Sequence, residues 1–160
     1  MLKNEYRGLI LSQEAEPPGS PRLIQEVEAK LGDSLPDQYV DFLNLRNGGY
    51  LHHYAKELFV DGEQLATPDR FYSAENLLKE YMPDEWKLDP CLLPIAESGY
   101  GDQFMIYVGG KKNGQIFALA ENLLCYPENR KACWPALIAD DFWSFVEILR
   151  EGQQFVIENR

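Results

Sequence analysis

The hydrophobic positions that follow Pro36 repeat with the period of a helix. The stripe falls at i, i+3, i+4 and i+7 and consists of Tyr39, Phe42, Leu43 and the stem of Arg46. Pro36 suits a first helical turn, where no amide hydrogen bond is lost. The Asn-Gly-Gly run at 47–49 supplies left-handed residues just past a helix end. The pattern predicts a helix over Pro36–Arg46 with a buried face.

Two other segments have the same helical period. The first, Pro21–Leu31, follows Ser20 as a candidate N-cap and ends at Gly32. The second, Asp140–Arg150, begins with an aspartate that can cap its first turn, and we expect it to stop at Gly152. These two segments complete a set of three main helices.

Strand patterns lie between the second and third helices. Short aromatic or β-branched runs at Tyr50–Tyr54 and Glu57–Val60 are bounded by the turn dipeptide Asp61-Gly62. Buried strands are predicted at Leu92–Ala96, Gln103–Val108 and Gln115–Leu119. We expect a hairpin between the last two, in which Asn113 and Gly114 adopt positive φ.

The remaining segments carry weaker signals. Residues 5–12 read as an edge strand or an extended arm packed on the core, and residues 69–72 as a loop or irregular strand. A brief helix is expected after Ser73, an acidic loop over Pro83–Pro90, and a broken strand or loop over Leu124–Trp134.

The order of helix, helix, antiparallel strands and helix predicts an α+β fold, a mostly antiparallel sheet with helices packed on one side. A length of 160 residues suits one domain. We therefore expect a single domain over residues 1–160, in which residues 1–19 form an N-terminal arm and linker. No internal repeat is present.

The helix-terminating motif also resembles a known family signature. Leu-Pro-x-x-Tyr-x-x-Phe-Leu from Leu35, closing on Asn-Gly-Gly, is similar to the signature of the SUKH superfamily of bacterial immunity proteins and their fungal cell-wall-regulator relatives. Later blocks follow in the family order at Leu92–Ala96, Gly99–Asp102, Gly114–Phe117 and Ile138–Phe145. The resemblance extends over roughly Leu23 to Leu149 and implies the same α+β arrangement.

Composition is that of an ordinary globular protein, with 45% hydrophobic and 12% aromatic residues. No run approaches the roughly 18 apolar residues of a membrane span. The first residues lack the apolar stretch of a secretory signal. We therefore expect a cytoplasmic protein.

The net charge of −11 argues against binding to nucleic acid or to an anionic membrane, because both need basic patches. The charge is concentrated in one segment. Residues Glu57–Asp102 hold eleven acidic and three basic side chains, which is eight of the eleven net negative charges. An acidic surface in this segment would suit a basic partner.

The cysteines and histidines do not form a metal or disulfide pattern. Cys91, Cys125 and Cys133 include no Cys-x-x-Cys pair, so we expect reduced and mostly buried thiols. His52 and His53 are adjacent and would point to opposite faces of a strand, which prevents them from chelating one metal together. We expect no metal and no cofactor.

No motif favours catalysis. The Gly99–Asp102 turn lacks the glycine spacing of a dinucleotide site, and Gly109–Lys112 lacks that of a P-loop. No Ser or Cys carries the local signature of a catalytic nucleophile. Asp140 and Asp141 suit helix capping better than paired acid and base roles. An enzyme is therefore the least favoured class.

The resemblance implies a protein-binding module, an immunity protein that binds and neutralises a cognate toxin, often a nuclease. A non-enzymatic regulatory or scaffold protein without a toxin partner is the alternative. The candidate partner-binding residues are the acidic side chains Glu80, Asp84, Glu85, Glu97 and Asp102. The sequence leaves open the identity of the toxin and the oligomeric state.

Overall fold

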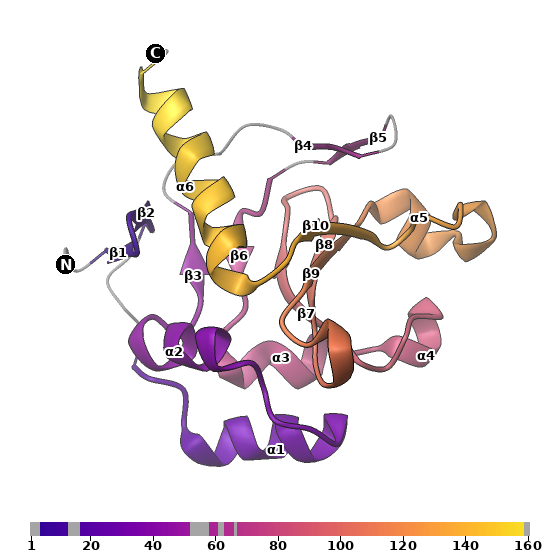
Figure 1. Ribbon diagram of the computed structural model, residues 1–160, viewed down its shortest axis with the longest axis horizontal. Coiled ribbons are helices and arrows are strands. Elements are labelled where there is room, and N and C mark those ends of the chain that lie inside the picture. The colour runs from indigo at the N-terminus through magenta and orange to yellow at the C-terminus, as the bar shows by residue number, and fades with distance from the viewer. Residues whose placement is uncertain (1–3, 13–16, 52–57, 61–62, 66, 159–160) are drawn as a thin grey trace.

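The computed structural model describes residues 4–12, 17–51, 58–60, 63–65 and 67–158. Its central element is a six-stranded sheet in the order β10-β9-β8-β7-β6-β3, in which every neighbouring pair is antiparallel (Figure 1). The strands are β3 (Gly49–Tyr50), β6 (Arg70–Phe71), β7 (Leu92–Glu97), β8 (Gln103–Tyr107), β9 (Ile116–Leu119) and β10 (Ala136–Ala139). Two separate hairpins consist of β1 (Glu5–Tyr6) with β2 (Leu9–Ile10), and β4 (Leu58–Val60) with β5 (Glu63–Leu65).

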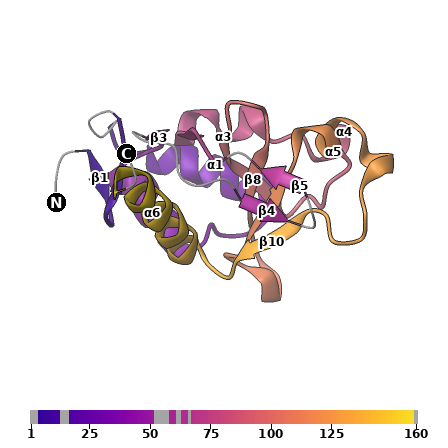
Figure 2. The same cartoon turned by 90° about the horizontal axis from the view of Figure 1, so that it is seen from above.

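Helices pack against this sheet, which confirms the α+β class. They are α1 (Pro21–Leu31), α2 (Asp37–Leu45), α3 (Ala74–Glu80), α4 (Pro83–Trp86), α5 (Glu121–Cys125) and α6 (Phe142–Glu158), with the 3-10 turns η1 (Gly110–Lys112) and η2 (Pro127–Asn129). The helices α1, α2 and α3 lie together at the bottom of Figure 1, and α6 lies above them in that view. In both views α4 and α5 lie at the opposite end of the molecule from β1 and β3 (Figures 1 and 2).

One face of the sheet carries an aromatic core. Phe71 and Phe104 share this face, because both pair with Ala96 of the strand between them. Their ring centroids lie 6.0 Å and 5.8 Å from that of Phe145 in α6. Side chains alternate between faces along a strand, so Arg70, which precedes Phe71, points away from α6. This alternation places Arg70 and Phe71 on opposite faces of the sheet.

Helix α2 joins the same core through Phe42. The Phe42 ring is fully buried, 5.0 Å from Phe71 and 5.3 Å from Phe142 between centroids. The helix lies within one residue of the predicted range at each end, with Pro36 as its N-cap residue. Arg46 is 2% exposed, which confirms its place on the buried stripe.

Helix α6 corrects the prediction at both ends. It starts at Phe142, because the carboxylate of Asp141, rather than Asp140, accepts the Ser144 amide hydrogen at 2.7 Å. It continues past Gly152 to Glu158. The Gln153 side chain exchanges two hydrogen bonds of 2.9 and 2.8 Å with the Ile10 backbone in β2, and this anchor offsets the roughly 1 kcal/mol helix cost of a glycine.

The segments predicted as loops contain short helices. The acidic loop over 83–90 includes α4, and the segment over 124–134 includes the end of α5 and then η2 rather than a strand. Arg130 holds this region together, since its guanidinium donates to the backbone carbonyls of Leu123 and Trp86, both at 2.7 Å, and of Lys87 at 3.1 Å. Such a clamp between distant segments leaves no periodic signal in the sequence.

The predicted strands β7, β8 and β9 are confirmed to within one residue, but their hairpin tip differs. Asn113 has a φ of −50° instead of a positive value, and the left-handed residues are Gly109, Gly110 and Gly114. The tip therefore folds as the 3-10 turn η1. Asn113 contributes through its side chain, whose carbonyl accepts the Gly109 amide hydrogen at 2.8 Å.

The N-terminal segment, the cysteines and the histidines complete the comparison with the sequence predictions. Residues 5–10 form the β1–β2 hairpin, and Tyr6 and Leu9 are fully buried in the core. Cys125 and Cys133 are exposed and Cys91 is half-buried, so the prediction of mostly buried thiols was wrong. Cys91 and Cys133 lie in turns and Cys125 is the last residue of α5, so none of the three lies in a core strand. His52, His53 and the Asp61-Gly62 turn lie outside the described residues.

We predict that Phe42→Ala lowers the free energy of unfolding by roughly 3 to 5 kcal/mol, because it removes a fully buried ring from an aromatic cluster. Urea denaturation followed by circular dichroism measures this loss. Leu45→Ala is the matched control on the same helix, since Leu45 is 48% exposed and should change stability by less than about 1 kcal/mol. Equal losses from both substitutions would contradict the assigned buried face.

Candidate partner-binding site

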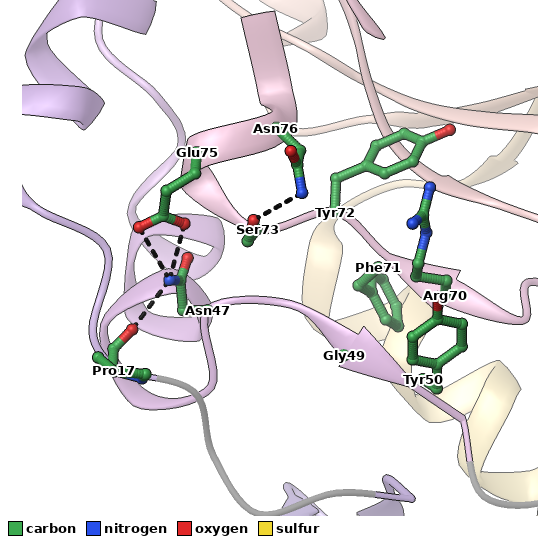
Figure 3. A pocket seen from close by; sticks show the side chains of 10 residues that line it. All are labelled: Pro17, Asn47, Gly49, Tyr50, Arg70, Phe71, Tyr72, Ser73, Glu75 and Asn76. Atoms are coloured by element: carbon green, nitrogen blue, oxygen red, sulfur yellow. Dashed lines mark hydrogen bonds between the residues drawn. The ribbon is translucent and has the colours of Figure 1, made fainter. Parts of the chain in front are cut away.

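The turn that ends α2 joins three segments of the chain. Asn47 adopts left-handed φ (+48°), and its side-chain carbonyl accepts the Ala74 amide hydrogen at the start of α3, at 2.8 Å. Its amide donates to the Pro17 carbonyl at 2.9 Å and to the Glu75 carboxylate at 3.1 Å (Figure 3). One buried side chain therefore holds the N-terminal linker and α3 against the end of α2.

The next residue, Gly48, permits a close approach between backbones. Its φ is +88°, and a Cβ atom there would lie 2.8 Å from the Phe71 carbonyl oxygen and from the Ser73 nitrogen. Only glycine combines this conformation with this space. The motif therefore sets β3 directly beside β6 and fixes the position of Tyr50.

A row of polar side chains then crosses four strands on the face that points away from α6. Tyr50 pairs with Arg70, Arg70 with Glu97, and Glu97 with Gln103 in the antiparallel register. We call these four residues the polar row. The row exists because side chains alternate along each strand, so the four residues share the face opposite Phe71 and Phe104; Tyr50 is exposed at one end and Gln103 is buried at the other.

The centre of the polar row is an ion pair. Arg70 donates from Nη2 to Glu97 Oε1 at 2.6 Å, with each side chain about 30% exposed, at 31% and 30%. The Arg70 guanidinium lies 5.2 Å from the centroid of the Tyr72 ring and 5.9 Å from that of Tyr50. Burial opposes the charge on Arg70, but Glu97 and both tyrosines outweigh it, so the pKa of Arg70 is raised. Arg70 is held in one place as a cation.

The Tyr72 hydroxyl contacts the Arg70–Glu97 ion pair through Glu97. This hydroxyl lies 3.0 Å from Glu97 Oε2 and 2.9 Å from Gln103 Oε1, where it can donate its single proton. Burial raises the pKa of Tyr72, and the charges of Glu97 and Glu80 raise it further. The phenol therefore stays protonated and acts as a donor.

A pocket of about 350 Å³ opens beside the polar row. Figure 3 shows Tyr50, Arg70 and Tyr72 on one side and Glu75 with Asn47 on the other. Burial raises the pKa of Glu75, but hydrogen bonds from its own amide, Asn47 and Ser73 outweigh this effect, so its pKa is lowered. The pocket thus combines an exposed tyrosine, an anchored arginine and an anionic glutamate.

The five predicted acidic residues occupy different environments. Glu97 lies in the polar row, and Glu80 is close enough for its charge to act on Tyr72. Asp84 and Glu85 are exposed on α4, at the other end of the molecule from β3 (Figures 1 and 2). Asp102 is 7% exposed, and its carboxylate accepts the Glu121 amide hydrogen at 2.9 Å. This contact holds the start of α5, and a partner-binding role for Asp102 stays a prediction.

Sequence reasoning missed Tyr50, Arg70 and Tyr72. Residues 69–72 lack a long strand pattern, since β6 contains two residues, and their pairing with β7 is a tertiary feature. One signal was present. Arg70 is one of three basic residues in an acidic segment, and such an isolated cation favours a specific ion pair.

The wider site is negative. Asp69 lies next to the polar row, where burial and the charge of Glu97 raise the pKa of its carboxyl. The three acidic side chains Asp69, Glu75 and Glu97 therefore stand against one basic side chain, Arg70. Within the described residues, no group of three or more His, Cys, Asp or Glu side chains is placed to hold a metal ion.

None of the helices in the described part of the chain is long and apolar enough to cross a bilayer.

We predict that Asn47→Ala lowers the free energy of unfolding by roughly 2 to 4 kcal/mol, because it removes a helix cap and leaves alanine in a left-handed conformation. Asn47→Gly should lose about 1 kcal/mol less, since glycine adopts this φ without strain. Urea denaturation measures both. Asn44→Ala, at an exposed asparagine in α2, is the control. A loss no larger than that of the control would contradict the role assigned to Asn47.

Two comparisons with known proteins bear on the identity of this chain. The model of the SMI1/KNR4 family (SUKH-1) matches residues 18–148. No curated protein sequence matches the chain. The matched range begins just after Pro17, the linker residue that Asn47 binds, and ends in α6, so it includes the polar row and all the pocket residues except Pro17.

Proposed function

The chain belongs to the SMI1/KNR4 family (SUKH-1), and we propose that it is a protein-binding module that binds and neutralises a cognate bacterial toxin. The family includes immunity proteins, which supports this class of function. We further propose that binding is one to one and that this protein itself catalyses no reaction.

The observation that carries the proposal is the polar row with its pocket. Tyrosine and arginine are the side chains that dominate binding energy in protein interfaces, because they combine large contact area with hydrogen bonds. Tyr50 is 46% exposed at the outer strand, and the anchored Arg70 stands beside it. An ordered, partly exposed pair of this kind loses little conformational entropy on binding.

Charge supports a basic partner. Residues Glu57–Asp102 hold eight of the eleven net negative charges. Glu75 lines the pocket, and the charges of Glu80 and Glu97 act on Tyr72, which also lines it. A nuclease toxin presents a basic surface to phosphate, and an acidic surface would gain association rate and specificity against it. A nuclease is therefore the first toxin class to test.

The experiment uses the toxin gene encoded beside this gene. The toxin is expressed in cells with and without this protein, and survival is scored. We predict that the wild-type protein restores growth and that Tyr50→Ala weakens toxin binding by at least about tenfold, as expected for a central interface tyrosine. Tyr126→Ala is the control, because Tyr126 is 57% exposed beside α5 at the other end of the molecule.

Three results would change this conclusion. Equal effects of Tyr50→Ala and Tyr126→Ala would move the interface away from the polar row while the immunity function stands. Survival that never depends on this protein, for any neighbouring toxin, would favour the regulatory or scaffold alternative. Turnover of a substrate in a screen would overturn the non-catalytic assignment.

We also predict that association with the toxin slows several-fold as salt rises to physiological levels, because exposed charges are then screened over about 8 Å. Asp84→Lys with Glu85→Lys should slow association further without changing dissociation, since these exposed residues act at long range. Stopped-flow mixing separates the two rates. A change confined to the dissociation rate would instead place α4 inside the contact, and rates independent of salt would contradict steering.

A further inference from the structure

A second groove lies on a different part of the surface, where β10 leads into α6 (Figure 1). Its volume is about 470 Å³, larger than that of the pocket at the polar row. The groove is lined by Arg7 from the β1–β2 turn, Ile138 and Asp140 from the end of β10, and Trp143, Glu147 and Ile148 from α6. Its lining combines the apolar side chains Ile138, Trp143 and Ile148 with charged ones.

One side of the groove is a sheet edge. Within the described residues β10 pairs only with β9, so its other side has no strand partner. Leu137 is 50% exposed and Ile138 is half-buried on this strand. An edge strand with unpaired backbone groups and apolar side chains can accept a further strand.

The other side of the groove presents a tryptophan in a fixed orientation. The Trp143 indole Nε1 donates to the Tyr6 hydroxyl at 3.3 Å, and that hydroxyl donates to Asp41 at 2.8 Å. The side chain remains 37% exposed. The Arg7 guanidinium lies 4.0 Å from the ring centroid, so this ring already contacts a cation within the chain.

The charges on the rim favour a basic occupant. Asp140, Asp141 and Glu147 line the groove against Arg7. Hydrogen bonds from Ser144 lower the pKa of Asp141, so its carboxylate is ionised at neutral pH. Arg150 pairs with Glu147 and compensates that charge, which leaves the two aspartates as the main negative groups at the mouth.

We propose that this groove docks an extended, basic and apolar segment of a partner protein, which adds as a strand beside β10. Its basic side chains would face Asp140 and Asp141, and an apolar side chain would lie on Ile138, Ile148 and the edge of Trp143. The backbone pairing provides affinity for any extended chain, and the aspartates select for positive charge.

A second copy of this protein is a poorer occupant. Each copy carries a net charge of −11, so two copies repel one another at low salt.

The proposal does not depend on the toxin, because the groove and the polar row contain different residues, and either site can be tested alone.

The test uses two synthetic peptides with capped ends, Lys-Val-Lys-Val-Lys-Val and its counterpart with glutamate in place of lysine. Each is titrated into the full-length protein and followed by nuclear magnetic resonance of the backbone amides of residues 136–139 and of the Trp143 indole. We expect saturable shifts at these groups with the lysine peptide, and affinity at least about tenfold higher than for the glutamate peptide.

Two matched variants locate the effect. Asp140→Lys and Asp84→Lys make the same change in net charge at exposed aspartates, one at the groove and one on α4. Asp140→Lys should weaken binding of the lysine peptide by at least about fivefold, and Asp84→Lys by less than about twofold. Unchanged fold is checked from the amide spectrum of each variant.

Several results would overturn the proposal. Shifts absent from residues 136–139 would exclude pairing at β10. Equal weakening by Asp84→Lys and Asp140→Lys would show general attraction to an acidic protein. Equal affinity for both peptides would remove the role of the aspartates. Self-association in analytical ultracentrifugation, together with amide shifts at residues 136–139 that depend on protein concentration, would assign the groove to a second copy instead.

Discussion

The hydrogen bonds of Asn47 are the constraint on which the rest of the site depends. Asn47 is 3% exposed, and its side chain caps α3 while its amide binds the linker at Pro17 and the carboxylate of Glu75. An apolar side chain at this position would leave the Ala74 amide and the Pro17 carbonyl without this partner, and buried polar groups of this kind are costly. The left-handed turn exists because asparagine and glycine adopt it at low cost.

This turn determines where function is possible. Gly48 brings the end of α2 against the backbone of residues 71–73, and β3 then pairs with β6 in one register. A shift by one residue would exchange Arg70 and Phe71 between the core and the outer face. The buried ring of Phe71 excludes that shift, because it would place a guanidinium against Phe145. The aromatic core therefore positions the polar row.

The helices and the long strands could be predicted because their signals are local. A capped stripe predicts α1 and α2, and apolar runs predict β7 and β8. The failures share one cause, which is that a distant partner decided the local structure. Gln153 binds β2 and carries α6 through Gly152, and the Arg130 clamp orders the segment in which a strand or loop was expected. Arg70 and Tyr50 meet only through strand register, so no spacing in the sequence relates them.

The acidic residues show what charge alone can and cannot locate. Glu97 and Asp102 stand five positions apart in one acidic segment, yet one takes part in a half-buried ion pair and the other accepts a hydrogen bond from a backbone amide inside the molecule. Asp84 and Glu85 are free to attract a partner over a distance. Attraction of this kind does not specify an orientation, because it acts on net charge rather than on shape. We infer that the acidic segment selects the class of partner, whereas the fixed tyrosine and arginine of the polar row determine how that partner is oriented.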